Sequence, residues 1–235
     1  MIEPKVSVLV VTYNHEDYIR KSLDSILSQK TTFEFNIVIG DDASSDSTAE
    51  IILEYKNKFG SKIKEKINSS NVGATRNIFN TMDRCNGEYI AMMGGDDFWI
   101  DNNKLQKQFE ELERNKEIVL HYTNCHTFID GNENERSDAI AFYPNTEFDI
   151  DFYFKHSCFT INSQTAFFRK SALPDIWEDW MYDSINQDWL YLILILKNGK
   201  ALFLNEYTGM YRLHPSSLTH STNKSSYNIN GLKLQ

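Results

Sequence analysis

Hydrophobic runs alternate with amphipathic stretches along the first hundred residues of the chain. The runs at 6–11, 35–39 and 89–93 are apolar and nearly continuous, and a weaker run lies at 63–67. Continuous, β-branched runs of this length are typical of parallel strands that are buried on both faces. Between them, apolar residues recur every three or four positions, which indicates helices that bury one face. The alternation predicts an α/β fold with a doubly wound, mostly parallel sheet.

The helices expected in this half bury three sets of side chains. These sets are Ile19, Leu23, Ile26 and Leu27; Ile51, Tyr55 and Phe59; and Ile78 and Met82. The second helix follows Ser47-x-x-Glu50, a capping box in which each side chain would accept a hydrogen bond from a free backbone N–H.

The pattern beyond residue 100 is less regular. We expect helices at 104–115, 149–155 and 186–198, strands at 119–129, 164–169 and 201–211, and an acidic, aromatic loop at 177–184. Leu105, Phe109 and Leu112 should face inward from the first of these helices. From His214 on, the polar composition predicts a mobile tail. We therefore expect one domain at 1–221, made of two functional halves (1–100 and 101–221), followed by a polar tail at 222–235.

Composition narrows the class of protein. The hydrophobic fraction of 41% is that of a globular chain, and the net charge of −9 argues against a broad nucleic-acid surface. Cys85, Cys125 and Cys158 show no metal-binding spacing, which indicates reduced packing residues. There is no signal peptide pattern and no apolar run long enough to span a bilayer. We expect a cytoplasmic protein, with peripheral attachment to the inner face of the membrane left open.

Acidic pairs follow two of the predicted strands. Asp41 and Asp42 end the second strand, while Asp96 and Asp97 follow the strand at 89–93 after Gly94-Gly95. The carboxyl ends of parallel strands meet at one edge of a sheet, which is where ligands bind. Carboxylates gathered there could hold a divalent cation, and the cation could hold a diphosphate. The alternative interpretation of Asp97 is a polar turn that caps the next helix.

Other nucleotide and hydrolase signatures are missing from the sequence. No G-x-G-x-x-G follows the first strand, which argues against a nicotinamide dinucleotide, and there is no G-K-[ST] phosphate loop. No G-x-S-x-G elbow is present, which argues against an α/β-hydrolase.

Four segments carry a resemblance to a known family. They are Val6–Asn14, Asp41–Thr48, Asn71–Asn77 and Gly95-Asp96-Asp97-x-Trp99. In order and spacing they resemble the family 2 glycosyltransferases of GT-A fold, and the resemblance covers nearly the whole chain. It implies an inverting transfer of a sugar from a nucleotide-diphosphate sugar, usually a UDP-sugar, to a hydroxyl acceptor, with Mg²⁺ or Mn²⁺ as cofactor. The first half would bind the donor. The second would bind a saccharide or lipid-linked saccharide acceptor, in bacterial surface polysaccharide synthesis.

The resemblance also implies roles for the matched residues of the first half. The nucleotide pocket would be lined by Thr12, Tyr13, Asn14 and Glu16. Asp42 would accept a hydrogen bond from the base, and Asp41 would support it. Arg76 would lie near the nucleotide or diphosphate, although a plain surface charge on a helix remains the alternative.

The metal would be held by the acidic pair and by a late histidine. Asp97 is the expected direct ligand, with Asp96 nearer the ribose or the sugar. In Tyr211-Arg212-Leu213-His214, which resembles the family's Arg-x-His element, His214 could ligate the metal and Arg212 could neutralise the diphosphate. Gly94 departs from the usual pattern, in which many members have Asp or Glu. The other histidines, His15 included, show no ligand spacing and receive no role.

The family's catalytic base is an acidic residue at a helix start in the second half. Asn186-Gln187-Asp188-Trp189 fits this description, so Asp188 is the candidate. Partial burial beside Trp189 would raise the pKa of Asp188 yet leave it ionised at neutral pH, as a general base requires. The alternative is a helix N-terminal charge that the macrodipole favours. Trp177, Trp180 and Tyr182 are candidates to stack on an acceptor sugar, or else are part of the core.

Three other kinds of protein remain as alternatives. A sugar nucleotidyltransferase can share a similar sheet, but it needs a basic, glycine-rich loop, and Thr12–Asp17 contains no Lys or Arg. A non-catalytic nucleotide- or carbohydrate-binding module, or an interaction protein with an acidic edge, would keep the fold without the reaction.

Overall fold

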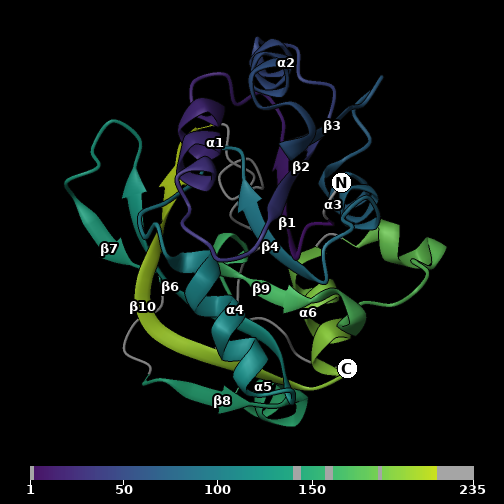
Figure 1. The fold of residues 1–235 in the computed structure, drawn as a ribbon, viewed down its shortest axis with the longest axis vertical. Coiled ribbons are helices and arrows are strands. Elements are labelled where there is room, and N and C mark those ends of the chain that lie inside the picture. Colours follow the sequence, from purple (N-terminus) through teal and green to yellow (C-terminus); the bar gives the residue numbers. More distant parts are fainter. Residues whose placement is uncertain (1–2, 140–143, 157–160, 185–186, 216–235) are drawn as a thin grey trace.

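The computed structural model describes residues 3–139, 144–156, 161–184 and 187–215. One mixed sheet of ten strands runs through the molecule (Figure 1). Its main path has the order β3-β2-β1-β4-β9-β6-β10-β5, while β7 pairs with β6 and β8 pairs with β10. The predicted tail at 222–235 lies outside the described residues.

The first half confirms the alternation of strands and helices that the sequence predicts. The strands are β1 (Val6–Thr12), β2 (Phe35–Asp41), β3 (Ile63–Ile67) and β4 (Tyr89–Gly94), and they pair with one another in parallel. The helices are α1 (Ile19–Leu27), α2 (Thr48–Phe59) and α3 (Ala74–Asp83), with a short 3₁₀ turn η1 (Gly60–Lys62) after α2. The carboxyl ends of β1, β2 and β4 therefore share one edge of the sheet.

The second half extends this sheet. Its strands are β5 (Phe98–Trp99), β6 (Ile118–Ile129), β7 (Arg136–Asp138), β8 (Thr146–Phe148), β9 (Phe167–Arg169) and β10 (Lys200–Leu213). Its helices are α4 (Lys104–Arg114), α5 (Ile150–His156) and α6 (Gln187–Leu196), with 3₁₀ turns η2 (Ser163–Thr165), η3 (Lys170–Ala172) and η4 (Asp179–Asp183). β6 and β10 run parallel, and β9 lies antiparallel between β4 and β6. The result is a mostly parallel sheet, as the sequence predicts.

The strand expected at 164–169 is shorter than predicted, because its first residues serve other partners. The Thr165 hydroxyl donates to the carbonyl of Thr123 at 2.9 Å, and the Gln164 amide donates to Cys125 Sγ at 3.1 Å. These side-chain bonds hold residues 163–165 in a 3₁₀ turn against β6. Only Phe167–Arg169 remains extended.

The capping box predicted at Ser47-x-x-Glu50 does not form as expected. Ser47 precedes α2 but makes no side-chain capping bond, and its own N–H donates to Glu16 Oε2 at 2.9 Å. The N–H of Thr48 donates to Asp46 Oδ1 at 3.0 Å. Carboxylates from two loops thus cap this helix, which ties α2 to the loop after β1.

Both faces of the sheet are covered, as a doubly wound fold requires. Val6, Val8 and Val10 of β1 pack with α1, α2 and α4 on one face, and Leu9 packs with α3 and α6 on the other (Figure 1). Burying a valine or leucine side chain fully contributes about 1.5–3 kcal/mol, so this central strand is a rigid support for the loop that follows it.

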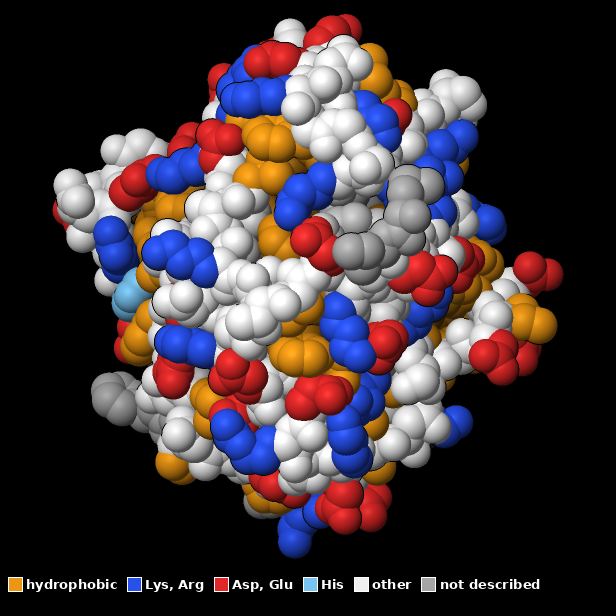
Figure 2. Space-filling view, in the orientation of Figure 1, with side chains coloured by type: hydrophobic (Ala, Val, Ile, Leu, Met, Phe, Trp, Pro, Cys, Tyr) orange, Lys and Arg blue, Asp and Glu red, His pale blue; other side chains and the backbone are white. Residues whose placement is uncertain are grey.

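The surface carries both signs of charge. On the face shown in Figure 2, Lys and Arg side chains alternate with Asp and Glu side chains and form no extended basic area. Cys85 and Cys125 are buried free thiols, while Cys158 lies outside the described residues. None of the helices placed in the described part of the chain combines the length and the apolar character needed to cross a bilayer.

Candidate functional site

The loop after β1 is fastened to the loop after β2 by reciprocal hydrogen bonds. The N–H of Asn14 donates to Ser44 Oγ at 2.9 Å, and Asn14 Oδ1 accepts from the N–H of Ser45 at 2.8 Å. The N–H of Glu16 donates to Asp46 Oδ2 at 3.1 Å. Asn14 has a φ of 56°, a left-handed conformation that asparagine tolerates better than most residues. Asn14 and Glu16 thus join the loop after β1 to the loop after β2 by hydrogen bonds.

Thr12 and Tyr13 differ in what they offer to a ligand. Thr12 is buried, and its hydroxyl lies 3.1 Å from His15 Nδ1. The Tyr13 side chain is 45% exposed, so its ring is open to a flat ligand such as a base. Whether Thr12, Tyr13, Asn14 and Glu16 contact a nucleotide stays a prediction.

Asp41 and Asp42 are both buried at the end of β2. Asp41 accepts hydrogen bonds from the N–H and the hydroxyl of Ser44, which oppose the rise that burial causes in its pKa. Asp42 accepts from the N–H groups of Val72 at 2.8 Å and Gly73 at 3.0 Å, and from the Asn68 amide at 3.1 Å. Asp42 thus holds the turn that leads into α3. Three donors already bind the Asp42 oxygens. The contact expected between Asp42 and the base stays a prediction.

Arg76 lies on the exposed side of α3. Its guanidinium lies 4.7 Å from the centre of the Tyr182 ring. One residue earlier, the Thr75 hydroxyl donates to the carbonyl of Ser184 at 2.7 Å. The start of α3 is therefore tied to the segment that precedes α6, and the diphosphate contact of Arg76 stays a prediction.

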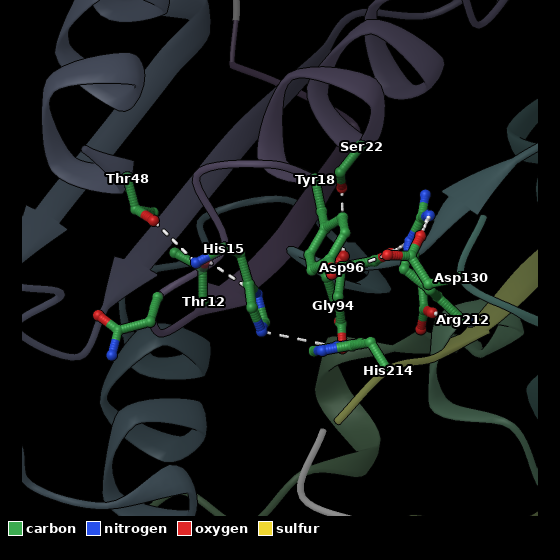
Figure 3. A network of polar contacts seen from close by, with 12 residues as sticks. Thr12, His15, Tyr18, Ser22, Thr48, Gly94, Asp96, Asp130, Arg212 and His214 are labelled. Atoms are coloured by element: carbon green, nitrogen blue, oxygen red, sulfur yellow. Dashed lines mark hydrogen bonds and ion pairs between the residues drawn. The ribbon is translucent and has the colours of Figure 1, made fainter. Parts of the chain in front are cut away.

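Three side chains converge beyond the end of β4 (Figure 3). His214 Nε2 lies 3.0 Å from Asp96 Oδ2, and His15 Nε2 lies 3.8 Å from the same oxygen. One ligand atom from each residue lies within 4.8 Å of the other two, and His214 is fully buried. Two imidazoles and one carboxylate form a donor set that suits a divalent transition-metal ion.

The pairing of β10 with β5 brings His214 to this place. Gly209 and Met210 pair with Trp99 and Phe98, so the end of β10 runs along the Asp96-Asp97 turn. The N–H of Arg212 then donates to Asp97 Oδ1 at 2.9 Å, which sets the register of the strand.

The side chain of Arg212 contacts the acidic turn. Its Nε donates to the carbonyl of Asp96 at 2.9 Å, and its guanidinium pairs with Asp130 beneath the ring of Tyr18. The Arg212 side chain is only 5% exposed. These two contacts position the acidic turn, and the diphosphate contact of Arg212 stays a prediction.

The two adjacent carboxylates have opposite pKa shifts. Burial works against ionisation of Asp96, but its hydrogen bond with His214 and the field of His15 lower its pKa below the ordinary value. Burial and the neighbouring charge of Asp96 raise the pKa of Asp97 well above its usual range. Asp97 accepts a hydrogen bond from the backbone N–H of Arg212, whereas Asp96 lies beside His15 and His214. Which of the two carboxylates binds a metal stays a prediction.

Asp188 lies in the first turn of α6. Burial raises its pKa to about 6, and the neighbouring Tyr191 hydroxyl opposes this rise. The neighbouring Trp189 is 48% exposed. Residues 185–186, just before this turn, lie outside the described residues.

Of the aromatic residues expected to stack on an acceptor sugar, one lies in the core and another lies on the surface. Trp177 is buried: its ring stacks on Phe79 at 4.2 Å, and its Nε1 donates to Asp83 at 2.7 Å. It belongs to the core and cannot stack on a sugar. Trp180 is 57% exposed and remains a candidate together with Tyr182.

A surface cavity of about 800 Å³ lies away from these residues, beside the start of β4. It is lined by Gly87, Tyr89, Arg169 and Lys170 among others, at the opposite end of that strand from Asp96. Lys170 donates to the carbonyl of Cys85, and Arg169 donates to Tyr89 and to backbone carbonyls, so their donors are engaged within the protein.

Sequence reasoning missed His15, Tyr18 and Asp130 in this site. His15 is a single histidine in a polar turn, and its partner His214 is separated from it by almost the whole chain, so spacing gave no signal. Tyr18 and Asp130 are joined by a hydrogen bond of 3.0 Å, which only the folded structure reveals.

Comparisons with known proteins give a family and a fold for the chain. Residues 7–177 match the model of the family described as glycosyl transferase family 2. An uncharacterized protein of Mycobacterium tuberculosis is 28% identical over 217 residues, which cover 92% of this chain and 61% of that protein.

Two solved structures share the fold. Staphylococcus aureus TarS in complex with UDP-GlcNAc matches with a TM-score of 0.70 and 18% identity, over 93% of this chain and 61% of that one. The mannosyltransferase PcManGT from Pyrobaculum calidifontis, in complex with GDP-Man and Mn²⁺, matches with a TM-score of 0.60 and 15% identity, over 92% of this chain and 59% of that one. The chain thus spans about three fifths of the length of these proteins.

Proposed function

The chain belongs to glycosyl transferase family 2, and on this premise we propose that it is the catalytic unit of an inverting, metal-dependent glycosyltransferase. It takes a sugar from a UDP-sugar and transfers it to a hydroxyl group of a saccharide acceptor. The observation that carries the proposal is the convergence of Asp96 and His214 at the shared carboxyl edge of β1 and β4.

The donor atoms at this edge fit a divalent cation. Asp96 Oδ2 and His214 Nε2 lie 3.0 Å apart, and the low pKa of Asp96 keeps its carboxylate charged. When bound, such an ion offsets the negative charge that builds on the departing nucleoside diphosphate. Asp97 and Arg212 fix the turn that carries Asp96, so they act as positioning residues.

The loops beside the cation site would hold the nucleotide. The turn after β1 is braced on the turn after β2, so the exposed ring of Tyr13 has a fixed base from which to pack on uracil. Asp42 holds the turn that leads into α3, and Arg76 lies in the first turn of that helix. The choice of UDP is supported by the complex of TarS with UDP-GlcNAc, which has the same fold.

Asp188 is the proposed general base. Its pKa of about 6 leaves it mostly ionised at neutral pH, yet far more basic than an ordinary aspartate. It takes the proton of the acceptor hydroxyl as that oxygen attacks the anomeric carbon from the face opposite the diphosphate. Attack from the opposite face inverts the anomeric configuration. Trp180 and Tyr182 would stack on the acceptor sugar.

A role in bacterial surface polysaccharide synthesis is part of the proposal. Its support is the name of one relative, the poly(ribitol-phosphate) beta-N-acetylglucosaminyltransferase TarS of Staphylococcus aureus, which is 38% identical over 98 residues. These residues cover 40% of this chain and 16% of that protein.

A thermal-shift panel of nucleoside diphosphates and sugar nucleotides, each with and without Mn²⁺, tests the proposal. We expect UDP and UDP-sugars with Mn²⁺ to raise the melting temperature most. A ligand at 100 times its Kd stabilises by about 2.7 kcal/mol, or on the order of 5–10 °C for a domain of this size. GDP, ADP and CDP should give smaller shifts. A panel in which no nucleotide shifts the melting temperature would contradict the donor assignment.

A further inference from the structure

His15 occupies a fixed position on the turn after β1. Its N–H donates to Thr48 Oγ1 at 2.8 Å, and its Nδ1 lies 3.1 Å from the Thr12 hydroxyl. Both contacts come from residues that are themselves buried. They orient the ring so that Nε2 points toward Asp96 (Figure 3).

The distances between these groups suit ligands of one ion. The separation of 3.8 Å between His15 Nε2 and Asp96 Oδ2 is too long for a hydrogen bond. With metal–ligand bonds of about 2.1 Å, however, two donor atoms on one ion lie roughly 3 to 4 Å apart. The 3.0 Å between His214 and Asp96 falls in the same range. The two imidazole rings meet edge to face at 5.8 Å, which leaves both Nε2 atoms near the same carboxylate.

Two glycines give His15 and Asp96 this space. A Cβ added at Gly95 would lie 2.9 Å from His15 Nδ1 and 2.5 Å from the Thr12 hydroxyl, so a side chain there would push the imidazole away. A Cβ added at Gly94 would lie 2.6 Å from Asp96 Oδ1 and would displace the carboxylate. The Gly94-Gly95 pair is therefore a steric requirement of this particular ligand arrangement.

From these observations we propose that His15 is a third protein ligand of the cation, and that the resulting two-imidazole, one-carboxylate set makes the site selective for Mn²⁺ and similar transition-metal ions over Mg²⁺. Imidazole nitrogens bind transition-metal ions well, whereas Mg²⁺ prefers oxygen ligands and keeps several waters. The proposal rests on the proposed function, since it concerns the cation of the same site.

The test measures metal binding directly, in the absence of nucleotide. Free Mn²⁺ is titrated into the wild-type protein and followed by electron paramagnetic resonance, with Mg²⁺ as competitor. We expect His15→Ala to weaken Mn²⁺ binding by about 10- to 100-fold, as loss of a direct ligand should cost at least as much as loss of its hydrogen-bonding partner. Mg²⁺ binding should weaken much less, because water replaces the lost nitrogen.

His126→Ala is the matched control. His126 also lies near a carboxylate, 3.6 Å from Asp138, but it sits within β6, opposite Met210. This variant should bind Mn²⁺ as the wild type does. Melting temperatures of both variants check that each remains folded.

A spectroscopic measurement separates a ligand from a residue that only supports the site. The electron spin-echo modulation of bound Mn²⁺ reports directly coordinated imidazole nitrogens. We expect signals from two imidazoles in the wild type and from one in His15→Ala. A wild-type spectrum with one imidazole, together with Mn²⁺-dependent UDP binding, would overturn the role of His15 and leave the proposed function standing. If the wild type binds neither Mn²⁺ nor UDP, both proposals fail.

Discussion

Replacing Asp96 by Asn should abolish the metal-dependent part of UDP binding while the protein remains folded. Asn has the same shape, but it lacks the charge that attracts the cation, and His214 would lose its ionised partner. We expect the Kd for UDP in the presence of Mn²⁺ to rise by on the order of 100-fold or more, since even indirect changes around a metal ligand cost 10- to 100-fold. Isothermal titration calorimetry with and without Mn²⁺ measures this effect.

Asp97→Asn is the control for this experiment. Its carboxyl group is buried, faces the N–H of Arg212 and has a strongly raised pKa, so a neutral amide of the same shape can keep the hydrogen bond. We expect a clearly smaller loss of UDP affinity than in Asp96→Asn, because the amide can keep this hydrogen bond and no direct metal bond is lost. If Asp97→Asn loses metal-dependent binding and Asp96→Asn keeps it, the ligand assignment is reversed, as the sequence alone had indicated.

Asp188→Asn should reduce turnover by about 10²- to 10⁴-fold, the usual contribution of a general base, and leave the affinity for UDP unchanged. The substitution should not unfold the protein, so a loss of turnover would be an effect on catalysis. The pKa of Asp188 is raised on folding to about 6, so the ionised carboxylate opposes the folded state at neutral pH. The amide removes this opposition, and the melting temperature should stay the same or rise. Steady-state kinetics with a UDP-sugar and the melting curve measure both effects.

The same residue predicts a pH dependence. In the wild type, kcat/KM should fall as the pH drops through about 6, because protonated Asp188 cannot accept the acceptor's proton. The variant has no such group, so the part of the profile that belongs to Asp188 should disappear. Turnover near the wild-type level, with an unchanged acid limb, would remove Asp188 from the role of base.

The fold of the first half could be predicted because local patterns determine it. Val6–Thr12 is buried on both faces, so its composition alone identifies a central strand. The second half depends on long-range pairing that no local pattern contains. The two-residue strand Phe98–Trp99 is too short to be recognised, yet its pairing with β10 places His214 at the site.

The acidic pair lies at the carboxyl edge of the sheet, as the sequence predicts, but the sequence does not distinguish the surroundings of its two members. Asp96 and Asp97 are adjacent and identical in type, so sequence cannot tell which side chain faces outward. In the structure, the backbone N–H of Arg212 donates to Asp97, a contact that no local pattern in the sequence contains. The sequence also does not reveal which polar side chains are buried. Lys104 has the composition of a helix-surface residue, yet its side chain is fully buried over the Trp99 ring.

The central claim is that a divalent cation held by Asp96 and His214 binds the donor's diphosphate. Anomalous diffraction at the manganese absorption edge, from crystals of the wild-type protein grown with Mn²⁺ and UDP, tests it most directly. The account predicts an anomalous peak within bonding distance of Asp96 Oδ2 and His214 Nε2, in contact with the diphosphate of UDP. Ordered UDP whose Mn²⁺ peak lies away from both side chains would contradict it.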